Sequence, residues 1–256
     1  MEVNDVVYSH DKKSNHINSL SFNIDKGKIT TVIGPNGCGK STLLGLLSNH
    51  YKPQKGTVTL ENRSLQQYTL KELARKIAVV HQENKAPVDM TVERLVGYGR
   101  LPYSSVFQGD QAKDNAVVSW ALDETNLTSK ATSQISTLSG GERQRVWIAM
   151  ALAQQTPYLF LDEPTTFLDL YYQYDILELI KRLNKKYGLT ILMVLHDINQ
   201  AIRYSDIIIT MKDGTLIKKG EPADVITQEL LYDIYQMDVL VKEEKEIGLY
   251  TVPIGG

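Results

Sequence analysis

The sequence contains little that would cross-link the chain or hold it in a bilayer. Cys38 is the single cysteine among 256 residues, so no disulfide can form within the chain, which is compatible with a reducing compartment. No apolar run approaches the roughly 18 residues that span a bilayer. Runs such as residues 191–195 and 207–209 predict core strands instead, and the acidic residues 1–5 lack a secretory pattern. We therefore expect a chain that is soluble by itself.

An excess of basic charge is also missing. The chain has 28 basic and 30 acidic residues, a net charge of −2 and a pI near 6.2. Such a balance supplies no overall positive field for a nucleic acid backbone, so we predict no nucleic acid partner. Its length suffices for one sizeable α/β domain, or for a core with a small subdomain.

A glycine-rich stretch, residues 33–43, directly follows the apolar run 29–32 and matches the spacing G-x-x-x-x-G-K-S/T. Its glycines let backbone N–H groups close around a polyphosphate, while Lys40 reaches the β and γ oxygens and Ser41 ligates Mg²⁺. A chance glycine-rich turn would not need the strand before it and the helix after it. We predict that ATP is bound by Gly34, Pro35, Asn36, Gly37, Cys38, Gly39, Lys40, Ser41 and Thr42.

The thiol of Cys38 lies inside this predicted phosphate loop. We expect a bulky maleimide at Cys38 to obstruct nucleotide binding, and MgATP to slow the labelling reaction.

Two carboxylates end a second apolar run, residues 158–161. In an open α/β sheet, ligands bind at the carboxyl ends of the parallel strands. Asp162 is therefore placed to hold Mg²⁺ through water, and Glu163, one residue further, can polarise a water in line with the γ-phosphate as general base. Solvated turn residues are the alternative interpretation of this pair.

Two more apolar runs deliver polar side chains to the same predicted edge. His196 follows residues 190–195 and can donate a hydrogen bond to a γ-phosphate oxygen, although a single histidine at a strand end is often structural. Gln82 follows residues 77–80 and is a candidate to sense Mg²⁺ or the attacking water, and a plain strand cap is an equal alternative.

Helical periodicity replaces strand signals from residue 87 to 155, which predicts a helical insertion. Within it, Ser139 is predicted to be the N-cap of a helix whose first residues are glycines. This helix start is either a second anion-binding site or only a cap. Residues 97–103 read as a loop, because they contain two glycines and a proline, and its aromatic side chains would pack locally or meet a partner.

The two ends of the chain read as accessory β structure. Residues 3–8 and 20–24 predict an antiparallel pair, in which Tyr8 is an aromatic platform for a base or a half-buried strand residue. Residues 207–211 and 215–218 predict a hairpin around a D-G turn. We expect the rest of the chain to form a small accessory tail, which comprises residues 222–236 and the strand-like residues 239–252.

In this order, the motifs resemble those of the nucleotide-binding subunit of an ATP-binding cassette (ABC) transporter, over nearly the whole chain. The resemblance implies an α/β fold with a P-loop NTPase (RecA-like) core, an N-terminal antiparallel β subdomain and an inserted α-helical subdomain. It implies one ABC ATPase domain over residues 1–256, with the core in 1–86 and 156–256 and the helical subdomain in 87–155.

The resemblance also implies roles for the residues that match the family's motifs. Gln82 stands at the Q-loop position, and Mg²⁺ is held by Ser41, Gln82 and Asp162. Glu163, His196 and Gln82 carry the catalytic step. ATP lies between two copies of the chain arranged head to tail, and it is bound by Tyr8, the phosphate loop, Ser139, Gly140, Gly141, Glu142 and Asp169.

Within the family, residues 97–103, 161–169 and 195–206 are similar to the ATPases of bacterial iron(III)-siderophore importers, whose relatives carry haem and cobalamin. This implies a separate membrane permease, an extracytoplasmic substrate-binding protein and a place at the cytoplasmic face of the membrane. A nucleic-acid factor of the same superfamily is disfavoured, because the chain has one cassette, no sustained heptads and no basic field. Glu163 and His196 disfavour a module that only binds nucleotide.

Overall fold

The computed structural model describes residues 1–10, 16–87, 89–103 and 110–254. The chain divides into two compact units, which are treated one at a time. The first unit comprises residues 1–67 and 190–256, and the second comprises residues 68–189. The boundaries at 86/87 and 155/156 stay predictions.

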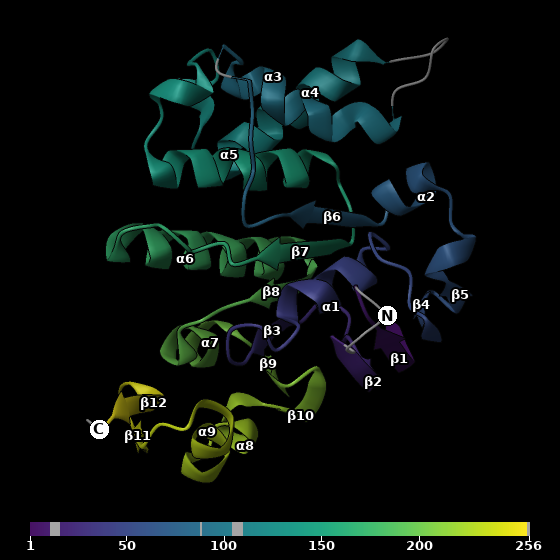
Figure 1. Ribbon diagram of the computed structural model, residues 1–256. Helices are drawn as coiled ribbons and strands as arrows, with labels where there is room; N and C mark the ends of the chain where they lie inside the picture. Colours follow the sequence, from purple (N-terminus) through teal and green to yellow (C-terminus); the bar gives the residue numbers. More distant parts are fainter. Residues whose placement is uncertain (11–15, 88, 104–109, 255–256) are drawn as a thin grey trace. The chain divides into compact units, whose positions relative to one another are not determined.

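An antiparallel sheet of four strands lies at the start of the first unit. Its strand order is β2-β1-β4-β5 (Figure 1). The strands are β1 (Glu2–Tyr8), β2 (Ile17–Asn23), β4 (Lys55–Leu60) and β5 (Arg63–Ser64), followed by a 3₁₀ turn, η1 (Leu65–Gln67). Val3 and Val6 of β1 and Leu20 of β2 are buried among exposed neighbours, as expected of a sheet with one covered face. The predicted N-terminal antiparallel sheet is confirmed.

Parallel strands form the buried centre of the first unit. β3 (Ile29–Ile33) pairs in parallel with both β8 (Thr190–Val194) and β9 (Ile207–Lys212). Every residue of β3 and β8 is buried, which explains why their sequences contain only apolar residues and threonine. β10 (Thr215–Gly220) turns back antiparallel to β9, so the predicted hairpin is confirmed.

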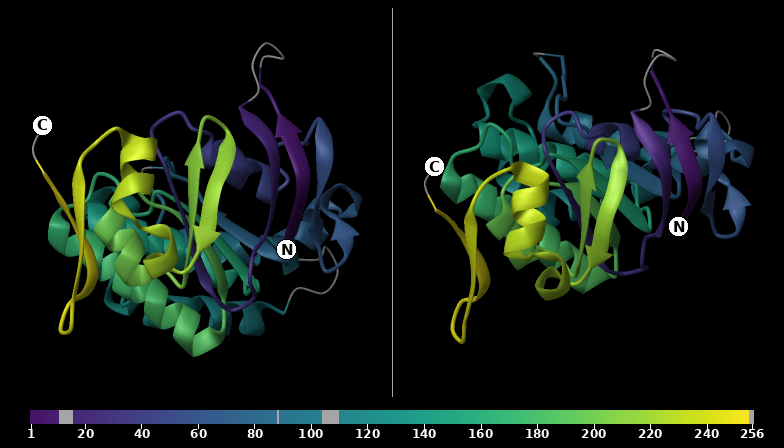
Figure 2. Two further views of the ribbon diagram at one scale, coloured as in Figure 1. Left: turned by 90° about the horizontal axis from the view of Figure 1, so that it is seen from below. Right: turned by 60° about the horizontal axis from the view of Figure 1, so that its bottom comes forward.

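The C-terminal tail has β structure at the predicted strand-like residues 239–252, divided into two strands. After α8 (Pro222–Val225) and α9 (Gln228–Tyr235), a hairpin forms from β11 (Val239–Glu244) and β12 (Gly248–Pro253) (Figure 2). The bond from Ile247 N–H to the Glu244 carbonyl (3.2 Å) closes the turn, and Gly248 supplies a backbone φ of +81°. This turn has no Asn-Gly or Asp-Gly pair, so no local signal predicts it.

The second unit combines one parallel strand pair with helices. β6 (Ile77–Val80) pairs with β7 (Tyr158–Asp162), and the elements described between them are all helical, which confirms the inserted helical subdomain. The helices of this unit are α2 (Leu70–Ala74), α3 (Val92–Gly97), η2 (Tyr98–Tyr103), α4 (Gln111–Glu124), η3 (Thr128–Lys130), η4 (Ile135–Thr137), α5 (Gly140–Ala153) and α6 (Leu170–Tyr187). Each helix of the described residues is too short or too polar to cross a membrane.

The loop predicted at residues 97–103 is wrong, because α3 continues there into the 3₁₀ helix η2. The buried guanidinium of Arg100 holds this turn: it donates to the Ala153 carbonyl and to Asp114 Oδ1, both at 2.8 Å, and lies 4.0 Å from the ring centroid of Tyr103. A Cβ on Gly99 would collide with the Met150 carbonyl. Gly99 is therefore required by the close contact between η2 and α5, and it does not indicate a loop.

Among the described residues of the first unit, the hydroxyls of Thr30 and Tyr235 are buried without a hydrogen-bond partner. The hydroxyl of Tyr235, at the end of α9, lies near the main chain of Gly34 but outside the geometry of a hydrogen bond, and burial raises its pKa. Cys38 of the phosphate loop lies near enough to affect the same pKa. An unpaired buried hydroxyl costs free energy, since it has left water without a replacement bond.

Replacing Tyr235 with Phe should therefore raise the free energy of unfolding by about 1 kcal/mol. The measurement is urea unfolding of the full chain. Tyr232→Phe is the matched control on the same helix, because the Tyr232 side chain is 52% exposed, and it should leave stability unchanged. A loss of stability in Tyr235→Phe would instead show that this hydroxyl accepts a hydrogen bond in solution.

Candidate functional site

The phosphate loop connects β3 to α1 (Lys40–Leu47), and close contacts fix its glycines. A Cβ on Gly34 would collide with the carbonyl oxygen of Met211, and one on Gly39 would lie 2.7 Å from the His16 carbonyl. Both glycines have positive φ, +155° and +101°. No side chain caps the start of α1, because Gly39 is its N-cap, so the helix opens with bare N–H groups suited to an anion.

The side chain of Lys40 folds back across the phosphate loop. Its Nζ donates to the carbonyl oxygens of Gly34 (2.8 Å) and Pro35 (2.9 Å), and the residue is buried. These bonds hold the ammonium group over the loop, where an approaching phosphate would meet it.

Cys38 is buried in this loop, and burial raises the pKa of its thiol. Its carbonyl accepts a hydrogen bond from Gly214 N–H (3.1 Å). Because the thiolate is the reactive form, burial is expected to slow the reaction of Cys38 with maleimide, and the effect of labelling on nucleotide binding stays a prediction.

Strand register brings His196 to the same edge as the phosphate loop. Val32 of β3 stands opposite Val194 of β8, so Gly34 and His196 each follow two residues beyond this pair. The Leu195 N–H donates to the Val32 carbonyl (3.2 Å) and extends the pairing up to His196. His196 is exposed, and the next residue, Asp197, caps α7 (Ile198–Tyr204).

The second unit brings Gln82 and Glu163 together by the same rule. Val80 of β6 stands opposite Leu161 of β7, and the two polar residues follow two positions later. Gln82 Nε2 donates to Glu163 Oε2 at 2.6 Å, and the hydroxyl of Thr166 donates to the same oxygen at 3.0 Å. Gln82 therefore contacts the predicted base, its role stays a prediction, and Thr166 joins the group without having been predicted.

Asp162 and Glu163 differ in surroundings although they are adjacent. Asp162 is the last residue of β7 and is 8% exposed, whereas Glu163 is half-buried and has left the strand with a φ of +50°. A non-glycine residue at positive φ is strained, and such strain clusters at functional sites. The two adjacent carboxylates therefore differ in burial and in backbone conformation.

The signature segment forms a complete capping box. The hydroxyl of Ser139 accepts from Glu142 N–H (3.2 Å), and the Glu142 carboxylate accepts from Ser139 N–H (2.8 Å). This backbone bond lowers the pKa of Glu142, and Lys130 at 3.5 Å adds to the effect. Ser139 is the N-cap, as predicted, and the carboxylate of Glu142 stabilises the start of the helix by accepting from Ser139 N–H.

The two glycines that follow Ser139 have different packing. A Cβ on Gly141 would lie 2.5 Å from Cδ1 of Tyr172 in α6, whereas one on Gly140 would meet Leu168 at 3.4 Å, an ordinary contact. Of the two glycines, only Gly141 cannot carry a side chain without overlapping a neighbour. Tyr172 is the residue that the sequence did not reveal as part of this segment.

Asp169 begins α6, but its side chain makes no capping bond, and the residue is exposed. Around it, Phe167, Leu170 and Tyr171 are exposed as well, between 69% and 89%. Three exposed apolar side chains within five residues form an unusual surface for a monomer.

Tyr8 packs in an aromatic cluster beside α1. Its ring stacks on Tyr51 with the centroids 5.1 Å apart, and its hydroxyl lies 3.2 Å from His10 Nδ1. His10 Nε2 in turn lies 3.4 Å from the hydroxyl of Thr42 in the phosphate loop. A base stacking on Tyr8 would have to use the face that Tyr51 does not cover.

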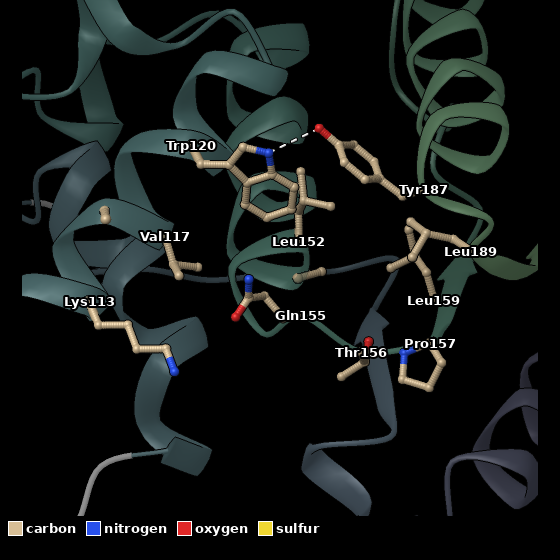
Figure 3. Close-up of a pocket in the computed structure, with 12 residues that line it drawn as sticks. Lys113, Val117, Trp120, Leu152, Gln155, Thr156, Pro157, Leu159, Tyr187 and Leu189 are labelled. Carbon is tan, nitrogen blue, oxygen red and sulfur yellow. Dashed lines mark hydrogen bonds between the residues drawn. The ribbon is translucent and has the colours of Figure 1, made fainter. Parts of the chain in front are cut away.

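A cavity of about 710 Å³ lies elsewhere in the second unit (Figure 3). Trp120 of α4 donates its indole N–H to the Tyr187 hydroxyl (3.0 Å) at its side, and Leu152 and Leu159 line it. Leu159 is near the start of β7, whereas Asp162 ends that strand. The cavity therefore lies near the start of β7, away from the carboxylates of Asp162 and Glu163 at its other end.

The side chains predicted to hold Mg²⁺ supply oxygen ligands, which this ion binds together with phosphate oxygens. The described residues contain no group of three or more His, Cys, Asp or Glu side chains that could hold a metal. Mg²⁺ is commonly bound by one or two carboxylates together with substrate phosphates. A hydroxyl from Ser41, an amide oxygen from Gln82 and the carboxylate of Asp162 are suitable oxygen ligands, provided that the phosphates of ATP complete the coordination.

A buried parallel sheet, a phosphate loop opening a helix, and a carboxylate beyond a strand end define a nucleotide-hydrolysing α/β protein. A family model described as ABC transporter matches residues 17–166. The chain belongs to this ABC transporter family, as its ATPase domain.

Similar curated proteins are import ATPases of bacteria. The chain is 45% identical over 248 residues to the iron(3+)-hydroxamate import ATP-binding protein FhuC of Bacillus subtilis, covering 90% of this chain and 92% of the relative. It is 42% identical over 238 residues to the ferric enterobactin transport ATP-binding protein FepC of Escherichia coli, covering 93% and 88%.

Solved structures agree with the fold. A metal-chelate type ABC transporter in an inward-facing conformation matches with a TM-score of 0.86 and 30% identity, covering 99% of this chain and 96% of the other. A dimeric ATP-binding cassette in a post-hydrolysis state with ADP and Pi matches with a TM-score of 0.74 and 29% identity, covering 86% and 98%. The predicted P-loop NTPase fold and the ATPase class are confirmed.

Replacing Gly141 with Ala should cost about 1–3 kcal/mol of stability, because its Cβ would overlap the Tyr172 ring. Gly140→Ala is the matched control and should cost well under half as much. Thermal unfolding without nucleotide measures both, and the double variant Gly141→Ala, Tyr172→Ala should show a smaller cost of the Gly141 change. Equal losses at Gly140 and Gly141 would contradict the steric account.

Proposed function

We propose that this chain is the ATP-hydrolysing subunit of an ABC importer, and that it powers uptake of an iron(III)-siderophore-type chelate through a separate membrane permease. Identities of 40–45% over most of the chain to three iron-chelate import ATPases support the substrate class. The hydrolytic part rests on one observation: Gln82 and Thr166 both hold the carboxylate of Glu163 just beyond the end of β7.

In this proposal the phosphate loop binds ATP. Lys40 would exchange its bonds to the Gly34 and Pro35 carbonyls for phosphate oxygens, and the N–H groups that open α1 would bind the same anion. Gly34, Asn36, Gly37, Cys38 and Gly39 supply backbone to this cradle, and the Thr42 side chain continues it along α1.

Glu163 acts as the general base in this proposal. Its carboxylate would accept a proton from the attacking water, with Gln82 and Thr166 fixing its orientation through the Oε2 atom. Ser41, Gln82 and Asp162 would hold Mg²⁺, which neutralises charge on the phosphates. His196 would donate a hydrogen bond to a γ-phosphate oxygen as negative charge develops there.

A second copy of the chain completes the proposed site. Ser139, Gly140 and Gly141 of one copy would face ATP bound to the other, head to tail, and Asp169 would lie at the same junction. The exposed side chains of Phe167, Leu170 and Tyr171 support a partner at this place, since burial of apolar surface stabilises association. A dimeric ATP-binding cassette among the similar structures supports the same arrangement.

The proposed location is the cytoplasmic face of the membrane, where a permease would hold the chain and an extracytoplasmic protein would deliver the chelate. The names of the relatives as import ATP-binding proteins support this placement.

Glu163→Gln should lower the turnover of ATP by at least about a hundredfold, because the amide cannot take the proton. Equilibrium binding of ATP should remain, and a dimer should accumulate with MgATP in size-exclusion chromatography. Thr166→Val, which removes one of the two bonds to Oε2, should slow turnover less. Hydrolysis by Glu163→Gln near the parental rate would disprove the assignment of the base.

Specific ATPase activity should rise with protein concentration, because a monomer carries only half of each site. The affinity for ATP of the dilute protein, measured by fluorescence of a labelled nucleotide, should not change over the same range. Activity per chain that is constant down to the dilution limit would rule out a shared site.

Deletion of the gene should abolish growth on one class of iron source. The panel contains hydroxamate and catecholate siderophores, haem and free iron, with cobalamin uptake measured separately, and a plasmid copy should restore growth while the Glu163→Gln copy should not. A defect confined to haem or to cobalamin would identify that alternative cargo. Unimpaired use of every source would overturn the import function.

A further inference from the structure

The helix that follows His196 is too short to hold its own position. α7 contains seven residues, and its first turn is capped by Asp197, whose carboxylate accepts from Gln200 N–H at 2.8 Å. Isolated helices of this length are unstable in water, because the cost of nucleation is not repaid. The direction of α7, and of the strand end that carries His196, must therefore depend on tertiary contacts.

One such contact joins α7 to the C-terminal hairpin. Asn199 Nδ2 donates to the Thr251 carbonyl (3.1 Å), and Asn199 Oδ1 accepts from Thr251 N–H (2.7 Å) and from the Thr251 hydroxyl (3.1 Å). The amide thus binds both main-chain groups of one residue, as a neighbouring strand would. Thr251 is buried and Asn199 is exposed, so these bonds are partly shielded from water.

The hairpin presents Thr251 in the register that this contact needs. Thr251 of β12 stands opposite Val241 of β11. Because its N–H and carbonyl bind Asn199, they point out of the hairpin, as in a non-hydrogen-bonded pair of antiparallel strands. The amide of Asn199 therefore occupies part of the outer edge of β12, where exposed backbone groups would otherwise invite pairing with another chain.

The hairpin in turn is attached to the rest of the first unit. An isolated two-stranded hairpin is marginally stable, but Val239 of β11 is buried. Before it, α9 is tied to the β9–β10 turn, since Lys212 Nζ donates to the carbonyl (2.6 Å) and to the carboxylate (3.1 Å) of Asp233. The hairpin can therefore serve as a fixed support for α7.

We propose that Asn199 is a positioning residue for ATP hydrolysis: by binding the main chain of Thr251, it fixes the first turn of α7 and thereby aligns His196. This inference rests on the role of His196 in the proposed function. The accessory tail then has a task in the hydrolytic step, because it holds the support against which the His196 segment is set.

Asn199→Ala should lower kcat for ATP about fivefold, while the dissociation constant of ATP should stay within twofold, because Asn199 lies outside the phosphate loop. The assay uses the full-length protein at a concentration where activity per chain has reached its plateau. Thr251→Val is the matched control: it loses the hydroxyl but keeps both main-chain bonds, so kcat should stay within twofold. Thr251→Pro lacks the N–H donor and should behave like Asn199→Ala.

A double-mutant cycle separates alignment of His196 from a general structural effect. In a His196→Ala background, Asn199→Ala should change kcat less than twofold, because the group that it aligns is gone. Full kcat in Asn199→Ala, or a fivefold fall that persists without His196, would overturn the inference. If Asn199→Ala unfolds, Asn199→Asp is used in its place; it keeps the acceptor for Thr251 N–H and should give a smaller, still His196-dependent fall.

The failure of this inference is distinguishable from failure of the proposed function. Parental turnover in His196→Ala would overturn the proposed role of His196, and with it this inference. Slow turnover in His196→Ala together with parental turnover in Asn199→Ala would overturn this inference alone.

Discussion

Parallel backbone pairing between buried strands determines where the proposed catalytic side chains stand. In the first unit the pair Val32 and Val194 sets Gly34 and His196 at one edge. In the second unit, Val80 and Leu161 do the same for Gln82 and Glu163. Because strands buried on both faces are fixed by packing as well as by hydrogen bonds, a shift of register would displace core residues and polar residues together.

Strained backbone begins where this pairing ends. Glu163 takes a φ of +50° directly after β7, and Gly34 takes +155° directly after β3. The strand before each turn supplies the hydrogen bonds that hold such conformations in place. For Glu163, bonds from Gln82 and Thr166 add to this constraint, so the carboxylate is oriented before any substrate is present.

Features encoded by neighbouring residues could be predicted from the sequence, and features made by distant contacts could not. The ends of apolar runs located Gln82, Glu163 and His196, because polarity changes abruptly where a buried strand ends. The stacking of Tyr8 on Tyr51 joins positions 43 residues apart, and no local period reports it. The loop predicted at residues 97–103 is wrong for the same reason, since the partners of Arg100 lie on α4 and at the end of α5.

The signature segment shows how one helix start can be both stable and suited to an anion. The first N–H groups of a helix lack partners within it, and here the hydroxyl of Ser139 satisfies only that of Glu142. The N–H groups of Gly140 and Gly141 stay outside the capping box. A carboxylate at this terminus would repel a phosphate, but Glu142 is turned onto Ser139 N–H and lies 3.5 Å from Lys130. The charge that stabilises the fold is thus compensated locally, which suits the proposed contact between the glycine backbone and the ATP of a second copy.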